Sequence, residues 1–267
     1  MSEIFQLYSA LIVLISMYMV CWYILSLIFR RNDVADVAWW IGFLLVAWYT
    51  LLSTPSGSYS SFIVAVLVSI WSIRLSLHIF LRNLWKGEDY RYKNWRDTWW
   101  KWFYIRSFFQ IFVLQGFLLL IISLPVVVVH LSRADFSYIH GFGLCLWGIG
   151  FLFESVWDYQ LAQFKKNPHN KGQLIRSGLW SLSRHPNYFG EVLQWWSLWV
   201  FTWTTPYFFL ASIGPLTITI LILFVSWIPM LEKKMSLHPD FADYAAKTNT
   251  FFPWFSRGSS LLQKRTK

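Results

Sequence analysis

Residues 4–29 read IFQLYSALIVLISMYMVCWYILSLIF, a run without a single charged side chain. A helix of about 20 apolar residues crosses the hydrocarbon core of a bilayer, and this run is longer than that. No small-residue cleavage site follows it, so we expect a retained membrane-spanning helix rather than a signal peptide.

Further apolar blocks of similar character follow along the chain, which is 56% hydrophobic, 21% aromatic and only 13% charged, with a mean hydropathy of +0.43. This composition excludes an ordinary soluble domain. It predicts an all-α, polytopic membrane helix bundle of about seven transmembrane helices. The expected spans are residues 4–29, 34–52, 62–81, 107–130, 139–161, 189–203 and 208–231.

Basic residues gather in alternate connections between these blocks. The connections at residues 53–61 and 204–207 carry no charge, and residues 131–138 carry only Arg133 and Asp135. Since cytoplasmic loops are enriched in Lys and Arg, we expect the N-terminus outside and the C-terminus in the cytoplasm. The net charge of +10 is therefore a sign of membrane topology, and we expect a lipid bilayer and no nucleic acid as partner. Trp95, Trp99, Trp100 and Trp102 suit a helix at headgroup level.

Ionisable residues also occur inside the apolar blocks, where they are costly against lipid. Arg74, His78 and Arg82 are spaced four apart and share one helix face, and Glu154 and Asp158 repeat that spacing. We expect both faces to look into the bundle. They mark either a functional site or a buried ion-pair network.

The most informative local sequence runs from Ser177 to Glu191 and contains Arg184-His-Pro-Asn-Tyr188. Pro186 keeps His185 out of the helical region, and the N–H groups of the helix that follows are suited to an anion. Phosphate partners are available in Arg184 and the nearby lysines, while Asn187 and Glu191 suit amide or hydroxyl groups. Residues 241–253 predict a short helix that folds back over this region.

Together these residues resemble the steroid 5-alpha-reductase C-terminal-domain superfamily, and most closely its bacterial branch. The matching stretches are Arg74 with His78 and Arg82, residues 87–91, Glu154 with Asp158, residues 184–191 and residues 232–253. The resemblance implies a membrane-embedded oxidoreductase that binds NADPH from the cytoplasmic side and reduces a carbon–carbon double bond of a lipid-like or sterol-like substrate.

The resemblance and the local chemistry together give an expected cofactor site. Its residues are Arg82, Tyr90, Arg91, Asp158, Lys165, Lys171, Arg184, His185, Asn187, Tyr188, Glu191, Lys233 and Tyr244. Reduction of a conjugated double bond leaves negative charge on a carbonyl oxygen, which needs a nearby proton donor. Asp36 and His78 are the expected catalytic residues. The Gln-Glu pair and the Tyr that grip a steroid in eukaryotic relatives have no counterpart in register.

Two other function classes stay open. The Arg-His-Pro-x-Tyr motif also occurs in isoprenylcysteine carboxyl methyltransferases, which use S-adenosylmethionine, and a non-catalytic lipid-binding or transport protein is the third class. We expect no metal, because the six histidines are scattered and no paired cysteines occur.

We expect a single membrane domain, with residues 1–130 on the substrate side and residues 131–267 on the cofactor side. Its location would be the inner membrane of a bacterium, or an endomembrane in a eukaryote.

Overall fold

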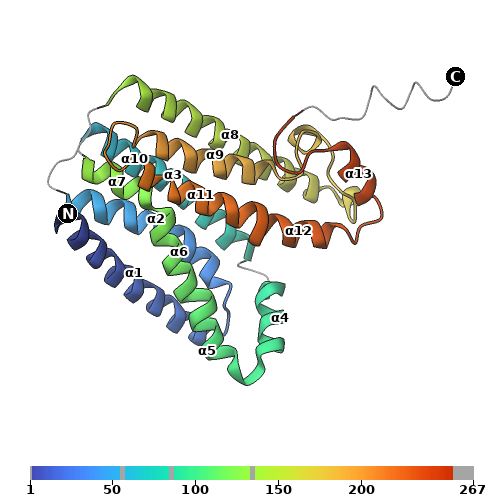
Figure 1. Cartoon of the computed structure of the whole chain (residues 1–267). Coiled ribbons are helices and arrows are strands. Elements are labelled where there is room, and N and C mark those ends of the chain that lie inside the picture. The colour runs from blue at the N-terminus through green and yellow to red at the C-terminus, as the bar shows by residue number, and fades with distance from the viewer. Residues whose placement is uncertain (1, 55–57, 84–86, 133–135, 255–267) are drawn as a thin grey trace. The chain divides into compact units, whose positions relative to one another are not determined.

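The computed structural model describes residues 2–54, 58–83, 87–132 and 136–254 (Figure 1). It divides the chain into two compact units, which we describe separately. Unit 1 contains residues 1–140 and 201–214, and unit 2 contains residues 141–200 and 215–267. Some charged positions of the sequence analysis lie outside the described residues. They are Lys86, Arg133, Asp135 and the predicted cytoplasmic tail from Arg257 to Lys267.

The described residues confirm a polytopic helical bundle. Most of unit 1 consists of α1 (Ser2–Phe29), α2 (Val34–Ser53), α3 (Tyr59–Asn83), α4 (Tyr90–Trp99), α5 (Phe103–Ser107), α6 (Leu114–Ile122), α7 (Leu124–Ser132) and α10 (Phe208–Ala211). A 3-10 turn, η1 (Trp100–Trp102), joins α4 to α5, and a π-helical segment, η2 (Phe108–Val113), joins α5 to α6.

Unit 2 contains most of α8 (Tyr138–Lys166), together with α9 (Pro186–Val200), α12 (Trp227–Met235) and α13 (Phe241–Lys247). The helix α11 (Ile213–Ile220) enters it and continues through the π-helical segment η5 (Leu221–Val225) into α12. Two 3-10 turns, η3 (Pro168–Asn170) and η4 (Gly178–Ser181), lie between α8 and α9. In Figure 1 these turns, the start of α9, the end of α12 and α13 gather at one end of unit 2.

The core of unit 1 forms where α2 packs on α3. Trp40 and Phe43 of α2 meet Trp71 of α3 edge to face, with ring centroids 5.1 and 5.5 Å apart, and all three side chains are buried. By contrast, only 22% of the apolar window in α1 is buried inside the protein. The remaining surface of α1 is therefore suited to lipid contact.

The predicted span at residues 107–130 is present with different bounds, because the segment of membrane length runs from Tyr90 to Ile122. The helix α6 ends at Ile122, and α7 starts again at Leu124. The physical reason is Pro125, which has no N–H to donate and is tolerated in the first turn of a helix but not in its interior.

Six helical segments are long and apolar enough to cross a membrane, judged by length and composition among the described residues. The predicted span at residues 189–203 differs from these. Its helix, α9, has only 15 residues and is followed by turns from Phe201 onward. Among the described residues there are thus six segments of full bilayer length, and one short helix where a seventh span was expected.

Candidate functional site

The Arg184 guanidinium lies at the centre of a polar cluster in unit 2, just before α9. Its Nε and one terminal nitrogen donate to the two carboxylate oxygens of Glu232, each at 2.9 Å. The pair is bidentate, and the Arg184 side chain is only 8% exposed. Glu232 lies on α12, so this pair joins the start of α9 to the end of α12.

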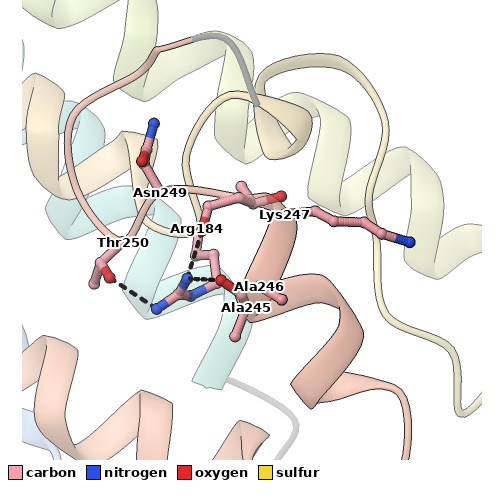
Figure 2. Close-up of a pocket in the computed structure, with 7 residues that line it drawn as sticks. Arg184, Ala245, Ala246, Lys247, Asn249 and Thr250 are labelled. Atoms are coloured by element: carbon pink, nitrogen blue, oxygen red, sulfur yellow. Dashed lines mark hydrogen bonds between the residues drawn. The ribbon is translucent and has the colours of Figure 1, made fainter. Parts of the chain in front are cut away.

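The remaining donors of Arg184 hold the end of α13 and the chain that follows it. They reach the carbonyl oxygens of Ala245 and Thr248 at 3.2 and 2.5 Å, and the Thr250 hydroxyl at 2.8 Å (Figure 2). A guanidinium has five N–H groups, and each has an acceptor here. Arg184 could contact a phosphate, as the sequence predicts, only by releasing one of these acceptors.

A pocket of about 240 Å³ lies between Arg184 and residues 245–250 (Figure 2). The backbone on either side is fixed by a short parallel pairing of Ser183 with Asn249, in which the Arg184 N–H donates to the Asn249 carbonyl at 2.9 Å. The predicted fold-back of the C-terminal segment is thus confirmed.

His185 belongs to the same cluster and is buried. Its Nε2 donates to Glu232 at 2.8 Å, its ring stacks on Tyr188, and its backbone N–H donates to the Ser183 hydroxyl. Because a carboxylate only accepts, Glu232 fixes the proton on Nε2. His185 is therefore oriented by the protein itself.

Asn187 differs from Arg184 and His185, because its side-chain oxygen is buried and accepts no hydrogen bond from the residues that the structure describes. It lies in the first turn of α9, directly after Pro186. A buried acceptor without a donor costs about 1–3 kcal/mol. A ligand that donates a hydrogen bond at this first turn of the helix would satisfy it.

Tyr244 links α13 to the turn η4. Its hydroxyl donates to the Trp180 carbonyl at 2.7 Å, and its side chain is buried. Burial raises the pKa of Tyr244 above its ordinary value, so the hydroxyl stays protonated as a donor. Of the other predicted cofactor residues in unit 2, Lys165, Lys171 and Lys233 are exposed, Asp158 and Tyr188 are half-buried, and Glu191 is buried.

A second buried polar pair lies where α8 and α9 cross. Gln194 donates to Glu154 at 2.8 Å, and both side chains are buried. The helices approach closely because Gly150 faces Gly190; a Cβ at position 190 would lie 2.5 Å from the Gly150 carbonyl oxygen. The sequence predicts that Glu154 faces the bundle, in a functional site or a buried ion-pair network, and its side chain is indeed buried. Neither Glu154 nor Gln194 was among the expected cofactor residues. The two glycines are the signal that predicts such a crossing.

Asp36, the first predicted catalytic residue, lies in unit 1 within a network of its own. Its two carboxylate oxygens accept from Arg91 at 2.8 Å and from the Tyr92 hydroxyl at 2.6 Å. Arg91 also donates to Asp89 at 2.9 Å. Although burial opposes it, hydrogen bonds from Arg91 keep the pKa of Asp89 below its usual value. Tyr92 was missed by sequence reasoning, and nothing in its local spacing pointed to Asp36.

The remaining predicted residues of unit 1 lie near the same end of α3 and the start of α4. His78 and Arg82 are one turn apart on α3, and Tyr90 begins α4. The predicted site thus consists of two groups, with Asp36, His78, Arg82, Tyr90 and Arg91 in unit 1 and the other ten residues in unit 2.

Comparisons with known proteins give one family match. The family described as "Protein of unknown function (DUF1295)" matches residues 22–248. An uncharacterised protein of Schizosaccharomyces pombe is 28% identical over 225 residues, which cover 72% of this chain and 62% of that protein. A probable O-methyltransferase of Ustilaginoidea virens is 46% identical over 46 residues, or 17% of this chain and 16% of that protein. No solved structure matches.

Proposed function

We propose that this chain, which belongs to the DUF1295 family, is a membrane-embedded reductase that uses NADPH to reduce a carbon–carbon double bond of a lipid-like substrate. The family is related to steroid 5-alpha-reductase-like membrane proteins. The observation that carries the proposal is the buried, unpaired side-chain oxygen of Asn187 in the first turn of α9.

The residues of unit 2 fit a dinucleotide. An unpaired carbonyl oxygen accepts from an amide or amino N–H, and both the nicotinamide carboxamide and the adenine ring carry such groups. The phosphates would be held by lysines. Three exposed lysines are available for this: Lys165 at the end of α8, Lys171 directly after η3, and Lys233 near the end of α12. Arg184 is then a positioning residue, because its donors hold Glu232 and the C-terminal segment.

NADPH would supply the hydride, and the chain would supply the proton and the binding site. A carbonyl oxygen that gains negative charge needs a donor beside it. Asp36 and His78 remain the proposed catalytic residues. The Tyr92 hydroxyl donates a hydrogen bond to Asp36, so Tyr92 would position that carboxyl group.

A second candidate function is supported by the short match to a probable O-methyltransferase. S-adenosylmethionine also carries an adenine amino group, so Asn187 suits either cofactor. The difference lies in charge: NADPH carries three phosphate groups, whereas S-adenosylmethionine carries none. The exposed lysines of unit 2 favour the phosphorylated cofactor.

The deciding experiment titrates the detergent-purified full chain with NADPH and, separately, with S-adenosylmethionine. We expect NADPH to bind and Asn187→Ala to weaken it about tenfold, the effect of one lost buried hydrogen bond. The matched control is Asn94→Ala, since the Asn94 side chain is exposed. Binding of S-adenosylmethionine alone would establish the second candidate, and an equal response of both variants would remove Asn187 from the site.

A further inference from the structure

A groove of about 570 Å³ lies in unit 1, apart from all the residues discussed so far as catalytic or cofactor-binding. Its lining includes Tyr23, Arg30, Asn32, Arg96, Phe103 and Tyr104. Only residues 30–33 separate α1 from α2, and both helices are long and apolar enough to span a membrane. The connection between two such spans has to lie at the membrane surface, so the groove opens at headgroup level.

The two arginines of the groove have different surroundings. Arg96 is neutralised by Glu88 through hydrogen bonds of 3.1 and 2.8 Å, and its guanidinium lies 4.2 Å from the centre of the Phe103 ring. Arg30 is exposed, and its guanidinium has no hydrogen bond or ion pair within the described part of the chain. Arg96 therefore forms a wall of the groove and adds no net charge to it. Arg30 gives the groove an uncompensated positive charge.

The backbone of Arg30 is a second, independent observation. Its φ is +54°, in the left-handed region that disfavours side chains other than glycine. The Arg31 N–H donates to the Ser26 carbonyl and the Arg30 N–H to the Leu27 carbonyl, which is the hydrogen-bond pattern of a helix end that normally has glycine at this position. An arginine at a position that favours glycine indicates that its side chain has a function that offsets the backbone strain.

The surroundings of the groove suit the boundary between headgroups and acyl chains. Trp100 and Trp102, on the turn before Phe103, are 83% and 54% exposed, and tryptophan is enriched at this depth of a membrane. On α1, Leu27 lines the groove and Val20 lies two turns before it on the same helix face; both are exposed apolar side chains. An occupant therefore meets a cation at one end and an apolar helix surface at the other.

We propose that this groove binds an anionic phospholipid, with Arg30 contacting the phosphodiester and the acyl chains lying along the exposed apolar side of α1. The partly polar wall of Asn32, Tyr23 and Arg96 then faces the headgroup. A zwitterionic choline headgroup fits less well, because its ammonium group repels the free arginine. The site is independent of the proposed reductase function.

The test is native mass spectrometry of the full chain with phosphatidylglycerol, with phosphatidylcholine of the same acyl chains, or with inorganic phosphate. We expect the wild type to bind phosphatidylglycerol about tenfold more tightly than phosphatidylcholine, the effect of one charge-assisted contact. Arg30→Gly should reduce this preference to less than twofold. Glycine is the residue favoured at this φ, so the variant should fold at least as well as the wild type.

The matched control is Arg106→Gln, which removes an exposed arginine of α5 that does not line the groove. It should leave the preference intact. Equal affinity for the two lipids in the wild type, or an equal loss of preference in both variants, would overturn the proposal. Displacement of phosphatidylglycerol by millimolar inorganic phosphate would also overturn it, because a free anion rather than a lipid would then be the ligand.

Discussion

Arg184 connects three parts of unit 2 that are distant in sequence: the start of α9, Glu232 on α12 and the chain from Ala245 to Thr250. We interpret the first two residues of the Arg-His-Pro-Asn-Tyr motif as positioning residues, because both donate to Glu232. Asn187 is then the proposed ligand contact of this motif.

The first prediction at this scale is that Arg184→Lys destabilises the protein by about 3 kcal/mol, the cost of breaking a buried ion pair. Lysine keeps the charge but cannot form the planar bidentate contact or reach all of the acceptors. The measurement is the free energy of unfolding by denaturant titration in mixed micelles. Arg176→Lys is the control, because its partners Asp240 and Asp243 are exposed and such pairs contribute at most about 1 kcal/mol. Equal losses would contradict the positioning role.

At single residues, the sequence indicated which side chains are unusual but not what they contact. The spacing of Arg184 to Asn187 predicted a polar group at a helix start, and the structure has that helix. The partner Glu232 is 48 positions away, and no local rule connects it to Arg184. In the same way, Asp36 stood out as an acid in an apolar block, whereas its contact with Tyr92 depends on how α2 and α4 pack.

At the scale of helices, the crossing of α8 and α9 depends on Gly150 and Gly190. Any side chain at position 190 meets backbone, because the Gly150 carbonyl oxygen lies 2.5 Å from the Cβ position and the Glu154 nitrogen 3.0 Å from it. Backbone cannot rotate away as a flexible side chain can, so the helices themselves must separate. The buried contact between Glu154 and Gln194 then lengthens or breaks.

We therefore predict that Gly190→Ala lowers the free energy of unfolding by about 1–3 kcal/mol, the usual cost of overpacking. Gly148→Ala, on the same helix as Gly150, is the matched control, since no atom lies within 4 Å of its Cβ position. That variant should keep or slightly raise stability, because alanine favours helix more than glycine does. If thermal unfolding in detergent shifted equally in both variants, the glycine contact would not govern the crossing.

Helix existence was predictable from the sequence, because apolar blocks of bilayer length have few alternatives. The positions of the helix ends were less predictable. Pro125 explains the break between α6 and α7. It could have been used as a signal, because a helix usually ends before a proline. The π-helical segments η2 and η5 have no comparable signal, because their sequences are as apolar as those of their neighbours.

At the scale of the whole molecule, the short helix α9 decides the number of membrane crossings. Its 15 residues extend over roughly 22 Å, less than the hydrocarbon core of about 30 Å. Even so, α9 runs beside the last span from end to end. Arg184, just before α9, pairs with Glu232, and Trp196 near its other end donates to Thr219 at 3.1 Å. If the segment from Thr219 to Glu232 crosses the membrane, α9 has to cross with it in the opposite direction.

We therefore predict seven crossings, with the N-terminus outside and the C-terminus in the cytoplasm, as the distribution of Lys and Arg indicates. Reporters that work on only one side of the membrane would be fused before Met1 and after Lys267, with a third inserted near Gly57; all three positions lie outside the described residues. The two termini should report opposite sides, and Gly57 should report the same side as the N-terminus. Six crossings would place both termini on one side. That result would mean that α9 does not cross the membrane, and it would contradict the contacts of Arg184 and Trp196 that hold α9 beside the last span.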